Sequence, residues 1–163
     1  MIISPLSLEE IAKNGYHKYA VVAGADIAAL GAVTTGTITI AKPIPAEVFG
    51  PVAIHVQTQF TSSDGTLANL TVSVGDAGSA TRYLGASEIL NNSFSAGYSS
   101  NTTFSCLTSP TTSVILTFAA TATKLLNTVT GGQLVVFWAS DNLASMDAEV
   151  SNTNLVELTE PVS

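Results

Sequence analysis

Residues 51–61, PVAIHVQTQFT, decide the fold class of this chain. Five alternate positions are predicted to share the inward face of a strand: Val52, Ile54, Val56, Thr58 and Phe60. The positions between them are on the whole more polar: Ala53, His55, Gln57 and Gln59. Successive side chains of a strand point to opposite faces, so this alternation predicts an antiparallel strand with one face in water.

Similar runs, rich in Thr, Val and Ile, recur along the chain. β-branched side chains suit a pleated, half-buried surface, so these runs predict further strands. The predicted strands lie at residues 16–23, 35–42, 67–75, 82–89, 102–108 and 113–120. Residues 133–139, apolar on both faces, are predicted as a central strand, and residues 155–159 are a candidate edge strand.

Turn residues separate these runs. Ser63-Asp64-Gly65 predicts a hairpin that pairs strand 51–61 with strand 67–75. Gly131-Gly132 is predicted as the turn into the last strong strand, and the Ala- and Gly-rich residues 24–33 as a loop or a single helical turn. Eight or nine short strands with regular turns predict an all-β fold, either a sandwich or a barrel.

The length of 163 residues fits a single domain, which we place at residues 16–163. Ser7-Leu8-Glu9-Glu10 matches a capping box, so residues 1–15 are predicted as an N-terminal arm or a short helix. The chain has a single cysteine, Cys106, which excludes an intrachain disulfide and a zinc site built from several cysteines.

The charge balance argues against nucleic acid as a partner. Twelve acidic and five basic residues give a net charge of −7, which repels a phosphate backbone. No charged residue occurs from Ile89 to Thr123, but Asn, Pro, Ser and Thr interrupt this stretch, so we expect no membrane span. The N-terminus also lacks the pattern of a secretory signal.

Candidate catalytic and metal-binding residues are few. His17 lies beside Tyr16, His55 lies on the polar face of its strand, and Cys106 lacks a nucleophile motif. We expect structural roles for all three residues, and a chain that is not an enzyme. The sequence therefore predicts no catalytic residue, no cofactor and no metal site.

The loop at Gly75-Asp76-Ala77-Gly78-Ser79 is superficially like a calcium loop, but it lacks the alternating ligands and final Glu of an EF-hand. We expect Asp76 to stabilise the turn and Arg82 to pair with it. Sequons begin at Asn69, Asn91 and Asn101, and such matches are expected by chance in a chain with 39 Ser and Thr residues.

The run from Leu70 to Gly78, followed by Thr81-Arg82-Tyr83-Leu84-Gly85-Ala86, resembles small head proteins of tailed bacteriophages. In many of these proteins an alternating strand ends in a Gly-Asp-x-Gly turn, which is followed by an Arg-aromatic-aliphatic segment. A later Gly-rich turn leads into an apolar strand, as at Gly131-Gly132 here. The similarity covers about residues 67–139.

The resemblance implies a capsid decoration (cement) protein with an antiparallel β-sandwich or jelly-roll fold. It also implies the major capsid protein as partner, a homo-oligomer (a trimer by analogy), and a place on the virion surface after synthesis in the host cytoplasm. No catalytic residues carry over. The chain is longer than the short decoration proteins and has an acidic tail, which leaves its place on shell, tail or fibre open.

The alternative is a tail, fibre or adhesin-type β-sandwich that binds carbohydrate or a host surface. Its signature would be exposed aromatic rings that stack on sugars. The candidates are Tyr16, Tyr19, Tyr83 and Tyr98, which otherwise pack in the core or in an interface. An enzyme would instead require His17 or His55 beside a carboxylate in a polar pocket.

Overall fold

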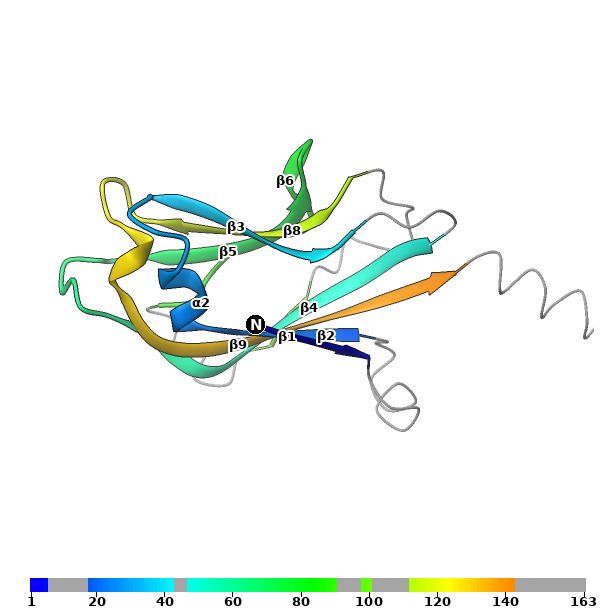
Figure 1. Cartoon of the computed structure of the whole chain (residues 1–163), viewed down its shortest axis with the longest axis horizontal. Coiled ribbons are helices and arrows are strands. Elements are labelled where there is room, and N and C mark those ends of the chain that lie inside the picture. Colours follow the sequence, from blue (N-terminus) through cyan, green and yellow to red (C-terminus); the bar gives the residue numbers. More distant parts are fainter. Residues whose placement is uncertain (6–17, 43–46, 91–97, 101–111, 143–163) are drawn as a thin grey trace, which may run out of the picture.

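The computed structural model describes residues 1–5, 18–42, 47–90, 98–100 and 112–142 of the chain. These residues form two antiparallel sheets that face each other as layers (Figure 1). The first sheet has the order β1 (Ile2–Pro5), β2 (Lys18–Ala23), β9 (Val129–Asn142), β4 (Glu47–Ser62) and β7 (Tyr98–Ser100). The second has the order β3 (Thr35–Ala41), β8 (Val114–Ala120), β5 (Leu70–Asp76) and β6 (Ser79–Glu88). The predicted all-β sandwich is confirmed.

The path of the chain between the sheets is that of a jelly roll. From β2 to β9 the chain alternates between the two sheets, except at β5 and β6, which are consecutive neighbours in one sheet. One sheet therefore contains β2, β9, β4 and β7 and the other β3, β8, β5 and β6, with β1 added beside β2. Eight strands in two such sheets are the jelly-roll arrangement, as the resemblance implied.

The core fills the space between the layers. Val52, Ile54, Val56 and Phe60 are buried, as the alternation in residues 51–61 predicts. Thr58 is exposed instead, because the pairing of β4 with β9 shifts register on both sides of it. A register shift turns the following side chains relative to the sheet, which a strict two-residue period does not anticipate.

The hairpin predicted for residues 51–61 and 67–75 is wrong. β4 pairs with β9 and β7, whereas β5 pairs with β8 and β6 in the other sheet. The connection 63–69 therefore crosses from one sheet to the other at one end of the sandwich. Turn chemistry marks where a strand ends, but it does not determine which sheet receives the next strand.

β9 is central in its sheet, as its apolar faces predict. The turn predicted at Gly131-Gly132 is wrong, because both glycines lie within β9. Gly132 has a φ of +107°, and a Cβ there would come within 2.5 Å of the Cα of Phe60. The pairing with β4 shifts register nearby, so the glycine pair serves a bulge and not a turn.

One short helix closes an end of the sandwich. Residues 24–33 were predicted to be a loop or a helical turn, and α2 (Gly24–Ala28) is that turn. The 3₁₀ turn η1 (Leu126–Thr128) lies at the same end of the molecule (Figure 1). Ile27 of α2 and Leu126 of η1 are both fully buried, so these two turns contribute side chains to the core at this end of the sandwich.

The segment predicted as an N-terminal arm or short helix contains the edge strand β1, which pairs with β2. Its capping box at residues 7–10 lies outside the described residues. The strands predicted at residues 102–108 and 155–159 also lie outside them. Among the other predicted strands, β6 and β8 confirm residues 82–89 and 113–120 to within a few residues.

Candidate functional site

Of the three residues singled out for chemistry, His17, His55 and Cys106, only His55 lies in the described part of the chain. His55 is half-buried on β4, opposite Val135 of β9. His17 and Cys106 lie outside the described residues. Among the residues that are described, no group of three or more His, Cys, Asp or Glu side chains is placed to hold a metal ion.

Asp76 organises the turn between β5 and β6. Its Oδ1 accepts hydrogen bonds from the backbone N–H groups of Gly78 and Ser79, both at 2.9 Å. Its Oδ2 accepts a hydrogen bond from Nε of Arg82 at 2.5 Å. The sequence-based expectation of an Asx turn closed by an Asp–Arg pair is thus confirmed. Both carboxylate oxygens accept hydrogen bonds, one from the backbone amides of the turn and the other from Arg82.

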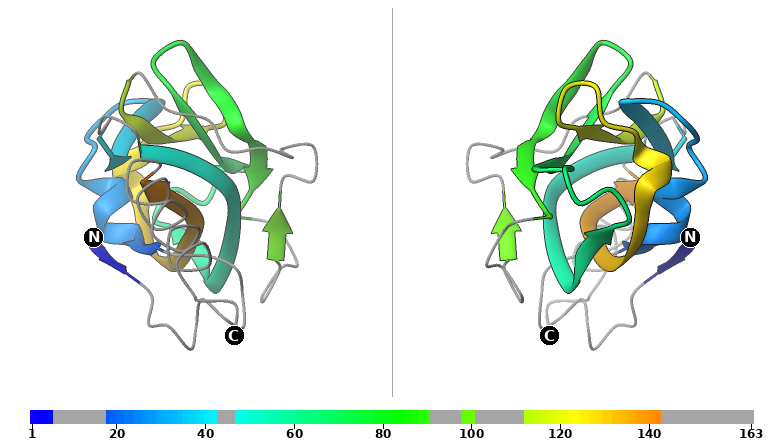
Figure 2. Two further views of the ribbon diagram at one scale, coloured as in Figure 1. Left: turned by 90° about the vertical axis from the view of Figure 1, so that its right-hand side faces the viewer. Right: turned by 90° about the vertical axis from the view of Figure 1, so that its left-hand side faces the viewer.

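This turn is also tight. A Cβ on Gly75 would lie 2.0 Å from the carbonyl oxygen of Ser79, so only glycine allows the two strands to approach so closely. The hairpin projects from its sheet when the sandwich is seen end-on (Figure 2). The Gly-Asp-x-Gly signature behind the resemblance therefore encodes the geometry of a protruding hairpin.

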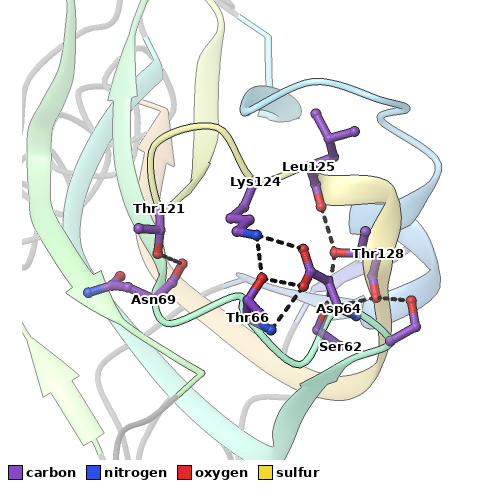
Figure 3. Close-up of polar contacts among 9 residues, drawn as sticks. Ser62, Asp64, Thr66, Asn69, Thr121, Lys124, Leu125 and Thr128 are labelled. Carbon is purple, nitrogen blue, oxygen red and sulfur yellow. Dashed lines mark hydrogen bonds and ion pairs between the residues drawn. The ribbon is translucent and has the colours of Figure 1, made fainter.

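A second polar cluster lies at the end of the sandwich where the chain crosses between sheets (Figure 3). Oδ1 of Asp64 accepts hydrogen bonds from the N–H and the hydroxyl of Thr66, at 2.9 and 2.6 Å. Oδ2 of Asp64 lies 3.3 Å from Nζ of Lys124, which also donates to Thr66. These hydrogen bonds, that of Thr66 first, lower the pKa of Asp64 below its ordinary value.

The same cluster continues along the turn before β9. The hydroxyl of Thr128 donates to the carbonyl of Leu125 at 2.7 Å, and the hydroxyl of Ser62 lies 3.0 Å from Oγ1 of Thr128. Thr121 donates to the carbonyl of Asn69 at 3.1 Å. These groups bond one another and the backbone, so the cluster fixes two loops together.

The aromatic candidates for sugar binding fall in different places. Tyr83 is 1% exposed and packs on Phe49, with ring centroids 4.9 Å apart, so it cannot stack on a ligand. Phe49 also stacks on Trp138, at 6.0 Å. Tyr19 is half-buried beside Phe137. Tyr16 lies outside the described residues, and for Tyr98 only the strand is described.

The most unusual surface is the outer face of the second sheet. Thr37 lies opposite Thr117, and Thr117 lies opposite Ser73, so three hydroxyl residues form a row across β3, β8 and β5. The flanking rows are also uncharged: Thr35, Ala119 and Thr71 on one side, and Thr39, Ile115 and Gly75 on the other. The outer face of an antiparallel sheet in water is ordinarily polar, and here the polar groups are hydroxyls, with no charged residue among the nine. We call these nine residues the hydroxyl face.

Exposure falls across the hydroxyl face from its edge to its middle. Thr35, Thr37 and Thr39 of β3 are exposed, Thr117 of β8 is half-buried, and Ser73 of β5 is 5% exposed. The accessible part is therefore the margin along β3. The sequence shows these Thr residues, but not the register that aligns them across three strands.

The helices among the described residues are too short to span a lipid bilayer. The chain matches no family model and no curated protein. It is similar to a chain of the cyanophage Pam1 capsid asymmetric unit, with a TM-score of 0.49 and 22% identity, over 75% of this chain and 79% of that chain. At this identity and score, the likeness carries no inference about function or partner.

Proposed function

We propose that this chain is a virion structural protein, a decoration (cement) protein that binds the outside of a tailed-phage capsid and stabilises it. The observation that carries this proposal is the strand order. Two facing sheets with jelly-roll connections recur in viral capsid and lectin domains. Because folds host many functions, the side chains must support the proposal as well.

The described polar side chains favour a structural role over catalysis. Asp64 pairs with Lys124, and Asp76 pairs with Arg82, so these carboxylates serve turns and loops. The exposed margin of the hydroxyl face, Thr35, Thr37 and Thr39, offers hydrogen-bonding groups without charge, and such groups dock on a partner at a lower desolvation cost than ions do. The resemblance of residues 67–139 to phage head proteins agrees with this assignment.

The finer parts of the proposal come from that resemblance. The partner would be the major capsid protein, the chain would act as a homo-oligomer, with three copies by analogy, and it would be made in the host cytoplasm. It would contact neither nucleic acid nor membrane and would catalyse no reaction. Residues 1–15 would help to hold a neighbouring protein on the capsid. Deletion of these residues tests that role, and a deleted chain that still binds the particle contradicts it.

The direct test uses heads assembled with the gene for this chain deleted. Purified chain is titrated onto these heads, and binding is measured by co-sedimentation together with the melting temperature of the shell. We expect saturable binding and a higher melting temperature. Heads that bind no chain, or that bind it without any gain in thermal stability, contradict the cement role.

The second candidate function is that of a tail, fibre or adhesin protein that binds carbohydrate. The fold supports it because lectin domains also use the jelly roll. The burial of Tyr83 removes one of its four candidate rings. A glycan array separates the two functions. Specific glycan binding without head binding favours the adhesin.

A further inference from the structure

The four strands at the edges of the two sheets differ in how they are protected. An edge strand presents unpaired backbone groups, and proteins usually shield it by shortness, charge, proline or bulges. β1 has four residues and ends at Pro5, and β7 has three residues. β6 is longer, but it contains Arg82 and Glu88, and its pairing with β5 shifts register twice.

β3 lacks most of this protection. Its seven residues, TGTITIA, include neither a charged residue nor a proline. Its pairing with β8 is regular from Thr35 to Thr39, and the single shift follows Thr39. Among the described residues, no strand pairs with its other side. Val33, just before the strand, is 40% exposed, one of only two large apolar side chains so exposed in the described part of the chain.

We propose that the edge of β3 that no described strand covers pairs antiparallel with β3 of a second copy of this chain, about a twofold axis at Thr37. In this register the regular segment Thr35–Thr39 pairs with itself along its whole length. Thr37 faces the second Thr37, and Thr35 faces Thr39. Cross-strand Thr pairs are favourable, and a strand that faces its own copy makes the self-complementary contact that a twofold axis requires.

Charge also points to a second copy as the occupant. Two chains of net charge −7 repel each other, so they must meet where carboxylates are absent. β3 and its neighbour β8 contain no charged residue. Pairing would join two hydroxyl faces into one wider face, with the row Ser73, Thr117, Thr37 continued into its symmetry mate.

The contact is small. A stable free dimer buries roughly 800 Å² on each partner, more than five paired residues provide. We therefore expect weak association in solution, strengthened where copies are held close together. A twofold contact joins two copies, so the trimer implied by the resemblance would need a separate contact. This inference concerns the free chain and does not depend on the proposed capsid role.

A disulfide trap tests the contact and its register in a chain that carries Cys106→Ser. Directly opposed residues in antiparallel strands lie about 4.5–5.5 Å apart at Cα, within disulfide range. T37C should form a covalent dimer on mild oxidation. T39C and T35C, on the same face of the same strand, should dimerise slowly when oxidised alone but rapidly when mixed.

Ala86→Cys is the control, because Ala86 is exposed on β6, at the other edge of the same sheet. Its rate of disulfide formation reports random collisions between chains. We expect T37C to dimerise about tenfold faster than A86C, because pairing raises the local thiol concentration. Equal rates for T37C and A86C overturn the proposal. A faster reaction of T39C or T35C alone overturns the register centred on Thr37.

Thr37→Lys supplies a second measurement without cysteine chemistry. It sets two ammonium groups opposite each other, which is unfavourable across paired strands. Sedimentation equilibrium at high concentration should show less dimer for T37K than for T58K, an exposed position on β4. If T37K instead abolishes head binding while T37C shows no excess of covalent dimer, the edge receives a strand of the shell, and the second copy is excluded.

Discussion

Arg82 reaches back across six residues to donate from Nε to Oδ2 of Asp76 at 2.5 Å. Burial alone would raise the pKa of Asp76, but the hydrogen bonds from Arg82, Ser79 and Gly78 outweigh it, so the pKa of this carboxyl lies below its ordinary value. The carboxylate therefore favours the folded state when ionised. This stabilisation is present above the unfolded pKa and is lost as the pH falls below about 4.

Asp76→Asn tests this dependence. The amide oxygen can still accept from the turn, but the ionic bond to Arg82 is lost, so we expect a loss of about 1 kcal/mol in the free energy of unfolding at pH 7. The difference from the native chain should shrink as the pH falls below 4, because acid removes the same charge. Urea unfolding at several pH values measures it. A difference that stays constant down to pH 2.5 contradicts this account.

Gly132 should tolerate no side chain. Gly132→Ala adds a Cβ that meets Phe60 at 2.5 Å and also forces alanine to a φ of +107°. We expect it to lose about 3 kcal/mol or more of folding free energy. Gly31→Ala is the matched control, since Gly31 has a φ of +94° but no atom within 4 Å of its added Cβ. It should lose only about 1 kcal/mol. Thermal unfolding measures both variants. If they lose the same stability, the positive φ alone accounts for the loss, and the contact of the added Cβ with Phe60 contributes nothing.

The single turn α2 should contribute to stability despite its length. Ile27 is fully buried, so Ile27→Ala should lower the free energy of unfolding by about 2–4 kcal/mol. Val33→Ala, at a 40% exposed position a few residues later, should lower it by less than about 0.5 kcal/mol. Denaturant unfolding of both variants makes the comparison. Similar losses for the two would show that α2 is not part of the core.

Much of the sandwich could be predicted from local sequence, because alternation, turn residues and two-sided apolar runs are local signals. The inward set Val52, Ile54, Val56 and Phe60 and the central place of β9 followed from them. Which strands pair did not follow. Strands β4 and β5 adjoin in sequence but belong to different sheets, since pairing depends on contacts between distant segments.

In the candidate site, too, local contacts could be predicted from the sequence and long-range contacts could not. The Asp76–Arg82 pair spans six residues, and spacing alone was enough to predict it. The hydroxyl face joins β3, β8 and β5, which lie far apart in the chain, and one residue of register decides whether Thr117 points outward or into the core. No local pattern holds that information.

Thr117 and Thr128 present opposite cases of a threonine hydroxyl. Oγ1 of Thr117 is buried and has no hydrogen-bond partner among the described residues, whereas Oγ1 of Thr128 bonds both Leu125 and Ser62. Thr117→Val keeps the β-branched shape and removes a buried hydroxyl that makes no hydrogen bond to any described residue. It should leave stability unchanged or raise it by up to about 1 kcal/mol.

Thr128→Val removes a hydroxyl that satisfies the carbonyl of Leu125 and accepts from Ser62, so it should lower stability by about 1–2 kcal/mol. Urea unfolding of both variants gives the comparison under one set of conditions. A loss at Thr117 equal to that at Thr128 would show that its hydroxyl has a partner after all.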